Sequence, residues 1–541
     1  MSPHQPAESW NSRIGVILAV SGSAVGLGNF LRFPGQAAQY GGGAFMIAYF
    51  ISLLIIGMSI CWAEWTLGRY AGRFGVHSSP AMFAVLIRKP WAKYLGVLGI
   101  IIPIGIYMYY VYIEAWCLGY AVSYLTGDLG RPGVDAGQHF ANFVGATKDG
   151  FAIGFSLKQV GIFVIAVYFL NFFLIYRGLA RGIELFCKFA MPSLIVIAII
   201  ILIRVLTLGS PVEGKPELSV LNGLGFMWNP GEVAQQLKNP QLWMAAAGQI
   251  FFSLSVGFGI IATYASYLTD KDDVVLSGLT ATAANEFCEV GLGGLITLPA
   301  GFMFLGAAGL VGQGTFGLGF SVLPIVFSHM PFGAFFGFLF FFLLFLAAVT
   351  SSLSMLQPGI AFLEEALSIR RRESVAILVF LTGMGSMFVW YFSQDLKALD
   401  TIDFWVGTFM IFIQGSLMII LFGWVVGIEK GFQEAHRGAN IRIPGFFRPI
   451  MKYVAPAYLA VIFVLWVLFN LLGWNGQFTG AEFNPTGYVL DLIGSPTVPP
   501  STVARLSVGI MILVAVFMLV ITSIAGNRWD NLSTHKQEGN Q

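Results

Sequence analysis

Two long apolar stretches of the chain are interrupted by glycines and small polar residues that could bind a ligand. They read Ser23-Ala-Val-Gly-Leu-Gly-Asn29 and Phe251-Phe-Ser-Leu-Ser-Val-Gly-Phe-Gly259. At membrane depth, unpaired backbone groups persist only where they line a cavity or bind something. Where a helix resumes, the free amides of Leu27 and Gly28 suit a carboxylate, and where helices stop, the carbonyls of Ala24, Phe252 and Ser253 suit an ammonium group. We therefore predict a site for a zwitterion; close helix packing at the glycines is the alternative.

Uncharged side-chain oxygens near these breaks could hold a cation. They belong to Asn29, Ser253, Asn285, Thr350 and Ser351. Hard cations such as sodium prefer several oxygen ligands, which this set provides without a second full charge. The alternative for each hydroxyl is a hydrogen bond to its own helix backbone one turn back.

The composition requires that a membrane positions these residues. The chain is 57% hydrophobic and only 10% charged, with 50 Phe against 29 Lys and Arg together. Apolar runs of about 20 residues, enough to cross a bilayer, recur about twelve times. We predict an all-α integral membrane protein with spans at 13–38, 43–70, 92–125, 157–176, 182–206, 241–269, 275–308, 335–367, 375–393, 402–427, 450–472 and 503–527.

The interrupted spans are numbers one and six, which indicates two repeats of five helices with opposite orientation. The predicted parts are a cytoplasmic N-terminal segment (1–12), the first repeat (13–206), an extracellular loop (207–240), the second repeat (241–427), a cytoplasmic loop (428–449), two additional helices (450–527) and a cytoplasmic tail (528–541). Residues 309–334, rich in glycine, are expected to fold back as a lid.

The basic residues predict the orientation. Most of the 29 Lys and Arg, including the run Arg370-Arg371-Arg372, fall on one side if both termini are cytoplasmic. We therefore expect a multi-pass plasma-membrane protein, of a bacterial inner membrane, and no nucleic-acid partner. The four cysteines lie in predicted spans, and neither they nor the six histidines have metal-site spacing. No nucleophile–base pair or phosphate loop indicates an enzyme.

Several motifs together resemble the neurotransmitter:sodium symporter family, in particular its bacterial leucine-transporter branch. The first is Ala24-Val-Gly-Leu-Gly-Asn-Phe-Leu-Arg-Phe-Pro34, followed by Gly41-Gly-Gly-Ala-Phe45. The others, in order, are Tyr109-Tyr-Val-Tyr-Ile-Glu114, Gln249-Ile-Phe-Phe-Ser-Leu-Ser255, Tyr264-Ala-Ser-Tyr267, Asn285-Glu286, Thr350-Ser-Ser352 and Asp403-Phe-Trp405. The resemblance covers nearly all of residues 10–470.

The resemblance implies a sodium-driven importer of a neutral amino acid that works by alternating access. It implies one sodium ion held by Ala24, Asn29, Ser253, Asn285 and the substrate carboxylate, and a second held by Gly22, Val25, Ala347, Thr350 and Ser351. Because the first ion would touch the substrate, each would favour binding of the other. It further implies that Tyr110 binds the carboxylate, that Ser255 helps to hold the amine, and that Ile106, Phe252, Phe258, Ser351 and Met355 line the side-chain pocket.

Two positions bear on what is transported. Monoamine carriers of the family have an Asp where this chain has Gly26, so the substrate is expected to bring its own carboxylate. Ile106 and Met355 favour a small or medium aliphatic L-amino acid, although Met is pliable and leaves methionine or an aromatic amino acid open. Glu289 lies where related carriers bind chloride, near Tyr49, Gln249 and Ser253. It would supply that negative charge, so transport is expected to be chloride-independent, with proton return by Glu289 as an open question; a packing carboxylate is the alternative.

The resemblance also implies two gates. Arg32 and Asp403 would pair when the outer vestibule closes, above Tyr110 and Phe252. Trp10, Tyr267 and Glu365 match the inner closing residues, but Ala7 stands where the family has an arginine. Glu64 and Glu114 are expected to brace the free amides of the broken helices.

Two other readings and one assembly state remain open. A membrane receptor or sensor could bind an amino acid without moving it, although paired sodium oxygens and two gates would then be superfluous. A proton-driven carrier would need an acid or base where this chain has Thr350 and Ser351. A homodimer is compatible with the sequence, which does not determine the oligomeric state.

Overall fold

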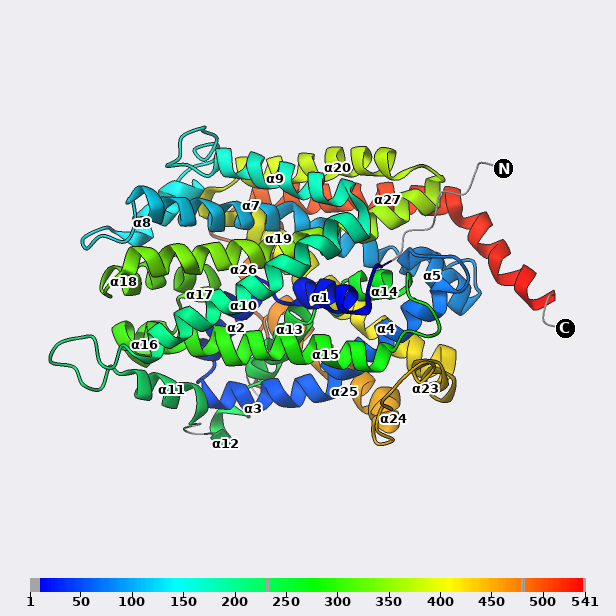
Figure 1. Ribbon diagram of the computed structural model, residues 1–541, viewed down its shortest axis with the longest axis horizontal. Coiled ribbons are helices and arrows are strands. Elements are labelled where there is room, and N and C mark those ends of the chain that lie inside the picture. The colour runs from blue at the N-terminus through cyan, green and yellow to red at the C-terminus, as the bar shows by residue number, and fades with distance from the viewer. Residues whose placement is uncertain (1–9, 230, 232, 478–479, 481, 539–541) are drawn as a thin grey trace.

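Most helices of residues 13–206 run along the long axis of the molecule (Figure 1). The computed structural model describes residues 10–229, 231, 233–477, 480 and 482–538, so Ala7, most of segment 1–12 and the end of the predicted tail lie outside the described residues. The helices here are α1 (Arg13–Ala24), α2 (Phe33–Gln39), α3 (Gly43–Ser52), α4 (Met58–Gly72), α5 (Ser79–Ile87), α6 (Ala92–Leu95), α7 (Leu98–Thr126), α8 (Ala136–Val144), α9 (Gly161–Tyr176) and α10 (Leu185–Leu206).

The rest of the chain continues the same all-helical architecture. The helices are α11 (Val220–Trp228), α12 (Val233–Gln236), α13 (Pro240–Ser253), α14 (Ile260–Ala265), α15 (Val274–Glu286), α16 (Leu295–Leu310), α17 (Gly314–Phe316), α18 (Leu323–Ser328), α19 (Gly333–Leu367), α20 (Arg371–Tyr391), α21 (Lys397–Ile402), α22 (Ile411–Ile420), α23 (Ile428–Ala435), α24 (Phe447–Pro449), α25 (Ala455–Trp466), α26 (Gly487–Ile493) and α27 (Thr502–Glu538). The described residues form no β-strand.

All twelve predicted spans coincide with helices. Short π-helical turns join several of these helices into longer continuous runs, for example α3 and α4 into Gly43–Gly72. Among the described residues, nine such runs or single helices are long and apolar enough to cross a membrane, and the bent pair Arg13–Ala24 and Gly28–Gln39 makes a tenth. The other two are Gly161–Tyr176, which has 16 residues, and the sixth span, which is split into α13 and α14. The last helix continues past the predicted end at residue 527.

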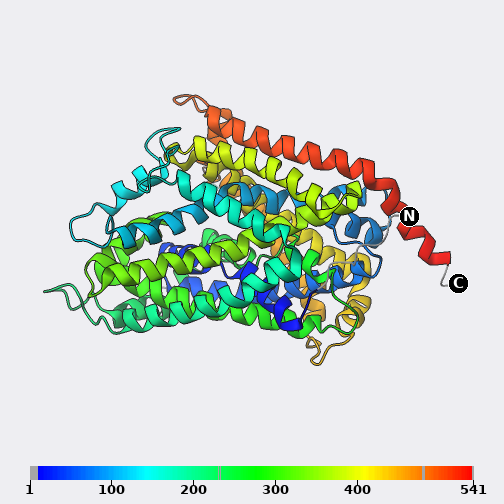
Figure 2. The same cartoon turned by 45° about the horizontal axis from the view of Figure 1, so that its top comes forward.

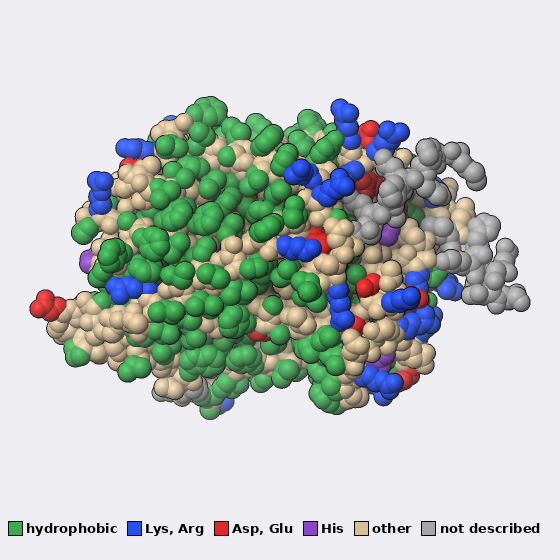
Figure 3. Space-filling model, viewed as in Figure 1, with side chains coloured by type: hydrophobic (Ala, Val, Ile, Leu, Met, Phe, Trp, Pro, Cys, Tyr) green, Lys and Arg blue, Asp and Glu red, His purple; other side chains and the backbone are tan. Residues whose placement is uncertain are grey.

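The surface agrees with a membrane environment. Hydrophobic side chains cover the middle of the molecule, and Lys and Arg side chains gather toward the end where both termini lie (Figure 3). Apolar side chains such as Phe169, Phe189 and Leu513 are about 70% exposed (71%, 69% and 69%). Lipid tails remove the penalty that water would impose on such a surface.

Two pairs of helices set the geometry around the site. The long helices α7 and α19 pack along each other through the centre of the molecule. α4 packs on α14 so closely that a Cβ atom on Gly68 would lie 2.3 Å from the Ala262 carbonyl oxygen, and one on Gly72 would lie 2.1 Å from that of Ser266. Only glycine permits this backbone-to-backbone approach.

Candidate functional site

The first break lies between α1 and α2. α1 ends at Ala24, Val25 is extended, and the chain becomes helical again at Gly28 through a π-helical turn, Gly28–Arg32. The two halves are bent by 45°. Asn29 Oδ1 accepts a hydrogen bond from the Gly26 amide at 2.8 Å, so one of the freed backbone groups is satisfied by a side chain of the site itself.

The second break lies between α13 and α14. α13 ends at Ser253 and the helix resumes at Ile260. Ser255 has a left-handed backbone (φ 54°), as have Gly257 and Gly259, so the chain turns sharply here. The Gly257 amide donates to Glu64 Oε1 at 2.9 Å, which confirms that Glu64 braces a broken helix. Glu114 instead accepts hydrogen bonds from Asn171 and Ser352 and braces intact helices, so that expectation is wrong.

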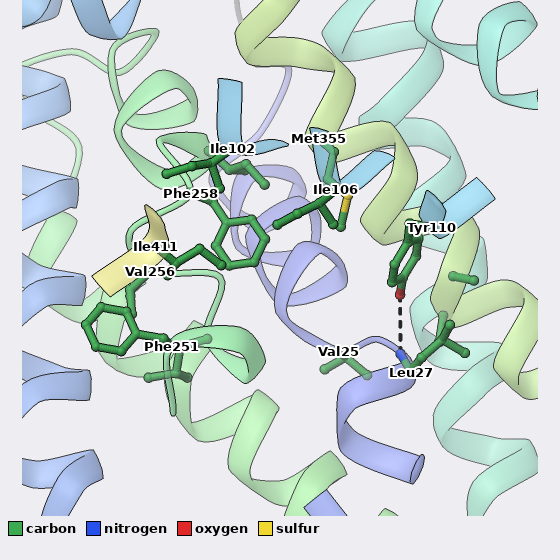
Figure 4. Close-up of a cluster of buried hydrophobic side chains, with 14 of the residues drawn as sticks. Val25, Leu27, Ile102, Ile106, Tyr110, Phe251, Val256, Phe258, Met355 and Ile411 are labelled. Atoms are coloured by element: carbon green, nitrogen blue, oxygen red, sulfur yellow. Dashed lines mark hydrogen bonds between the residues drawn. The ribbon is translucent and has the colours of Figure 1, made fainter. Parts of the chain in front are cut away.

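The two breaks meet at the centre of the molecule. Ser255 Oγ donates to the Ser23 carbonyl oxygen at 2.9 Å, and Ser351 Oγ donates to the same oxygen at 3.3 Å. From the other side the Leu27 amide donates to the Tyr110 hydroxyl oxygen at 3.4 Å (Figure 4). An amide and a hydroxyl lie on one side and freed carbonyls on the other, which is the polarity that a zwitterion requires.

An apolar wall adjoins this polar centre. Ile106 on α7, Met355 on α19 and Phe258 from the second break point toward one another (Figure 4). All three are buried, and the Phe252 ring lies 6.2 Å from that of Phe258. Figure 4 also places Ile102, Val256 and Ile411 around this wall, which sequence reasoning missed because apolar residues on these segments carry no signal that separates a pocket from a core.

Asn29, Ser253 and Asn285, three of the four residues predicted for the first sodium ion, form one buried network with Glu289. The Asn29 amide donates to Asn285 Oδ1 at 2.8 Å and to Glu289 Oε2 at 3.1 Å, and Asn285 donates to Ser253 Oγ at 2.7 Å. Ser253 Oγ donates to Glu289 Oε2, and Gln249 donates to Glu289 Oε1 at 2.6 Å. Three neutral oxygens beside one carboxylate are a donor set that fits a sodium ion. Tyr49, one of the predicted neighbours of Glu289, donates to Glu286 Oε2 at 2.8 Å and also interacts with Glu289.

The residues predicted for the second sodium ion also come together. Ser351 Oγ is 3.4 Å from the Gly22 carbonyl oxygen, and a Cβ on Gly22 would lie 3.2 Å from Thr350 Cβ. Thr350 donates to the Ala347 carbonyl oxygen of its own helix at 2.9 Å, and the single Ser351 hydroxyl proton is shared between the carbonyl oxygens of Ala347, at 3.1 Å, and Ser23. Each hydroxyl oxygen keeps a lone pair, and Val25 is fully buried at the adjoining break.

A vestibule opens on the side of the centre opposite the termini. This cavity of about 300 Å³ is lined by Leu27, Gly28, Arg32, Tyr109, Tyr110, Ile113, Phe252, Gly314, Thr315, Phe316, Leu399, Asp400, Asp403 and Tyr488. The stretch Gly314–Phe316 belongs to the predicted lid and lines the vestibule as expected. Arg32 lies 4.6 Å from the centre of the Phe252 ring, and Asp403 accepts from the Tyr109 hydroxyl at 2.5 Å. In the described part of the chain Arg32 and Asp403 form no ion pair, so the outer gate is not latched by them in this conformation.

On the inner side the contacts of the predicted gate residues within the described part of the chain are with neighbouring residues. Trp10 donates to the Tyr264 carbonyl oxygen at 3.2 Å, and Tyr267 stacks on His77 with the ring centres 4.2 Å apart. Glu365 accepts from the amides of His77 and Ser78 at 2.9 and 3.0 Å.

Glu184, which sequence reasoning missed, holds the start of α1. It accepts from the Asn11 amide at 2.9 Å and from Ser12 Oγ at 3.0 Å, and it pairs with Lys188 at 2.7 Å. The sequence feature that could have indicated this contact is a glutamate next to an apolar run, in Gly182-Ile-Glu-Leu-Phe. In this structure Glu184 supplies the contact that fastens the inner end of the first span.

Broken helices that meet at the centre of an apolar helical bundle, beside oxygen-rich positions, define a membrane transporter of the secondary type. The model of the sodium:neurotransmitter symporter family matches residues 7–141 and 147–520. The chain belongs to this family, and its curated relatives are sodium-dependent transporters rather than enzymes.

Two sequence relatives and one solved structure illustrate the similarity. An uncharacterized sodium-dependent transporter of Methanocaldococcus jannaschii is 29% identical over 90% of this chain and 97% of its own length. Another from Haemophilus influenzae is 28% identical over 84% of this chain and 97% of its own length. The crystal structure of MhsT in complex with L-phenylalanine superposes with a TM-score of 0.73 at 27% identity, and the match covers 85% of this chain and 99% of that one.

Proposed function

We propose that this sodium-dependent transporter imports a neutral L-amino acid with an apolar side chain, together with two sodium ions and without chloride. The observation that carries the proposal is the meeting of the two breaks, where the Leu27 amide and Tyr110 hydroxyl face freed carbonyls and neutral oxygens. The α-carboxylate and α-ammonium groups of an amino acid match these two sides.

The wall of the site supports an uncharged, apolar side chain. Ile106, Phe258 and Met355 offer no polar group, and a charged side chain buried against them would be strongly disfavoured. MhsT was crystallised with L-phenylalanine, so a larger aromatic substrate is the main alternative to an aliphatic one. Thermal stability with a panel of amino acids distinguishes the two.

Chloride independence rests on Glu289. This buried carboxylate accepts hydrogen bonds from Asn29, Gln249, Ser253 and Asn285, and it lies beside the first proposed sodium ion. A fixed negative charge at that distance stabilises a cation without a bound anion. Uptake into proteoliposomes in which gluconate replaces chloride tests this directly.

The orientation is supported by the distribution of basic side chains. Lys and Arg gather at the end where the termini lie (Figure 3), and the positive-inside rule favours that end as cytoplasmic. The vestibule then faces outward, as import requires.

The test is the thermal stability of the purified protein in sodium or potassium, each with the twenty amino acids, because a ligand of the folded state raises it. We expect a few apolar amino acids to stabilise the protein in sodium only. Ser351→Ala should weaken this sodium dependence. The matched variant Ser352→Ala, whose hydroxyl contacts Glu114 instead, should retain it. Stabilisation that ignores sodium would favour an amino-acid receptor.

A further inference from the structure

A group of buried polar side chains lies behind the transport site, on helices that do not break. Glu114 on α7, Asn171 on α9 and Ser352 on α19 are all fully buried. The three helices pack against one another (Figure 2). Glu114 lies one helical turn after Tyr110, and Ser352 directly follows Ser351, so the group adjoins the proposed substrate and sodium sites without belonging to either.

The two oxygens of the Glu114 carboxyl group have different surroundings. Oε2 accepts hydrogen bonds from Asn171 Nδ2 at 3.0 Å and from Ser352 Oγ at 2.6 Å. Oε1 has no hydrogen-bond partner among the described residues. A carboxylate has two equivalent oxygens that only accept, whereas a protonated carboxyl group has one carbonyl oxygen and one hydroxyl that donates. The asymmetry around Glu114 is that of the protonated form.

Asn171 provides the acceptor that a hydroxyl at Oε1 needs. Its Nδ2 donates to Glu114 and, at 3.4 Å, to the Tyr107 hydroxyl oxygen, so both amide protons are used. Its Oδ1 has no hydrogen-bond partner in the described part of the chain. Buried acceptors without a donor are destabilising, and one proton between these two oxygens would satisfy both.

From this arrangement we propose that Glu114 and Asn171 form a proton-binding site of the helical scaffold. The Glu114 carboxyl group is neutral at pH 7, and its hydroxyl at Oε1 donates to Asn171 Oδ1. Together with the hydrogen bond from Asn171 Nδ2 to Oε2, this closes a ring of two hydrogen bonds between α7 and α9. Because the ring joins two unbroken helices, the proton stays bound during transport, and Glu114 adds no charge beside the second sodium site.

A charged Glu114 or a bound cation explains the two oxygens less well. Among the described residues, no lysine, arginine or histidine forms an ion pair with Glu114, and an unpaired charge at membrane depth is strongly disfavoured. A sodium ion between the two oxygens would need several further oxygen ligands. The titratable groups around the pair carry no charge at pH 7; they are Tyr107, Tyr110 and Cys117 on α7 and Tyr168 on α9.

Infrared difference spectroscopy of the full-length protein tests the proposal without a transport assay. A protonated carboxyl group has a C=O stretching band that a carboxylate lacks. We expect such a band at pH 7 in the wild type, in sodium and in potassium alike, and its loss in Glu114→Gln. In Asn171→Ala the band should remain but move to a higher wavenumber, because both hydrogen bonds to Asn171 are lost. This shift identifies the band even if Glu114→Gln does not fold.

The matched variant Glu213→Gln changes an exposed glutamate and should leave the band unchanged. Alkaline pH gives a second measurement. The folded protein holds a proton that the unfolded chain has already released at pH 7, so the stability falls as the pH rises until that proton is lost. Between pH 7 and pH 9 the Tm should therefore fall less in Glu114→Gln than in the wild type or in Glu213→Gln. Sodium-dependent uptake by Glu114→Gln at pH 7 should match the wild type.

Four results would overturn the proposal. Identical bands in the wild type and Glu114→Gln would show that Glu114 is charged. A band that is present in potassium and absent in sodium would assign the two oxygens to a cation. Equal losses of Tm in the wild type and Glu114→Gln would show that folding does not retain a proton on Glu114. Loss of sodium-dependent uptake in a folded Glu114→Gln would show that the proton takes part in transport.

Discussion

At the scale of single residues, Gly26 illustrates how closely the substrate centre is built. A Cβ atom there would lie 2.8 Å from Ser351 Oγ and 3.0 Å from the Tyr110 hydroxyl oxygen. Both groups belong to the proposed binding site, so a side chain at position 26 would displace them. Gly26 therefore affects substrate choice in two ways. It leaves no space for a side chain at this position, and it offers no carboxylate to pair with an amine.

Gly26→Ala should weaken amino-acid binding by about tenfold or more, since overpacking of this kind costs about 1–3 kcal/mol. The measurement is the sodium-dependent affinity for the best substrate of the thermal panel. Gly248→Ala is the matched control, because this glycine lies in α13 of the other broken span and a Cβ on it meets nothing within 4 Å. Equal affinities of the two variants would show that the space around Gly26 does not limit binding.

Glu289 is the second residue whose identity sets a property of transport. Glu289→Ser removes the fixed charge from the network of Asn29, Ser253 and Asn285, so we expect uptake to become dependent on chloride, which would restore that charge. The measurement is amino-acid uptake into proteoliposomes with and without chloride. Glu286→Gln changes the neighbouring carboxylate, which binds Tyr49, and should leave uptake chloride-independent. Uptake by Glu289→Ser that ignores chloride would argue for a packing role.

At the scale of elements, the first span is held at two points of different strength. Its middle is fixed by hydrogen bonds at the break. Its inner end depends on Glu184, which lies just before α10 and binds Asn11 and Ser12. Hydrogen bonds to a charged group contribute about 1.5–3 kcal/mol each. Loss of Glu184 should therefore release the inner end without dismantling the break.

Glu184→Ala should increase the reactivity of Cys187 toward a membrane-permeant maleimide by about tenfold or more. Cys187 is buried, and its sulfur lies 3.4 Å from where a Cβ on Gly22 would be, so it reports on opening beside the proposed second sodium site. Peptide mass spectrometry separates Cys187 from the other three cysteines. In the control variant Lys188→Ala, which removes only the ion-pair partner of Glu184, Cys187 should react with the maleimide at the wild-type rate. If Cys187 reacts as fast in Lys188→Ala as in Glu184→Ala, the contacts of Glu184 with Asn11 and Ser12 do not hold the inner end of the first span in place.

At the scale of the whole molecule, acid should destabilise the folded protein through His77. Burial lowers the pKa of this imidazole to about 4 from its ordinary 6.5. The unfolded chain therefore takes up the proton first as pH falls below 6.5, and stability is lost between pH 6.5 and 4. At pH 5 the loss is about 2 kcal/mol.

The measurement is the difference in Tm between pH 7 and pH 5 for the wild type and for His77→Gln. The variant should show the smaller difference, because other titrating groups contribute equally to both proteins. Equal Tm differences in the two proteins would show that His77 has the same protonation state in the folded and the unfolded chain.

Most of the architecture could be predicted from the sequence, and the partners of individual polar groups could not. Hydropathy locates the spans because crossing a bilayer needs about 20 apolar residues, and the glycine-rich interruptions at residues 23–29 and 251–259 locate the breaks. Glu286 and Glu289, by contrast, lie three residues apart on one helix face, so only side-chain geometry decides that Tyr49 binds Glu286. The hydrogen bonds from Asn11 and Ser12 to Glu184 join residues more than 170 positions apart in the chain, and no local sequence pattern predicts them.

The contact of α4 with α14 has a mechanical consequence. Gly68 and Gly72 place the two backbones against each other without intervening side chains. The helices therefore cannot slide past one another, and they move as one rigid unit. If the inner half of the sixth span tilts during transport, α4 tilts with it and carries the buried Arg69, which donates to the backbone carbonyl oxygens of Asp272 and Arg437. Spectroscopic labels on α4 and α14 would then keep a constant separation through the cycle while both change their distance to α7 and α19.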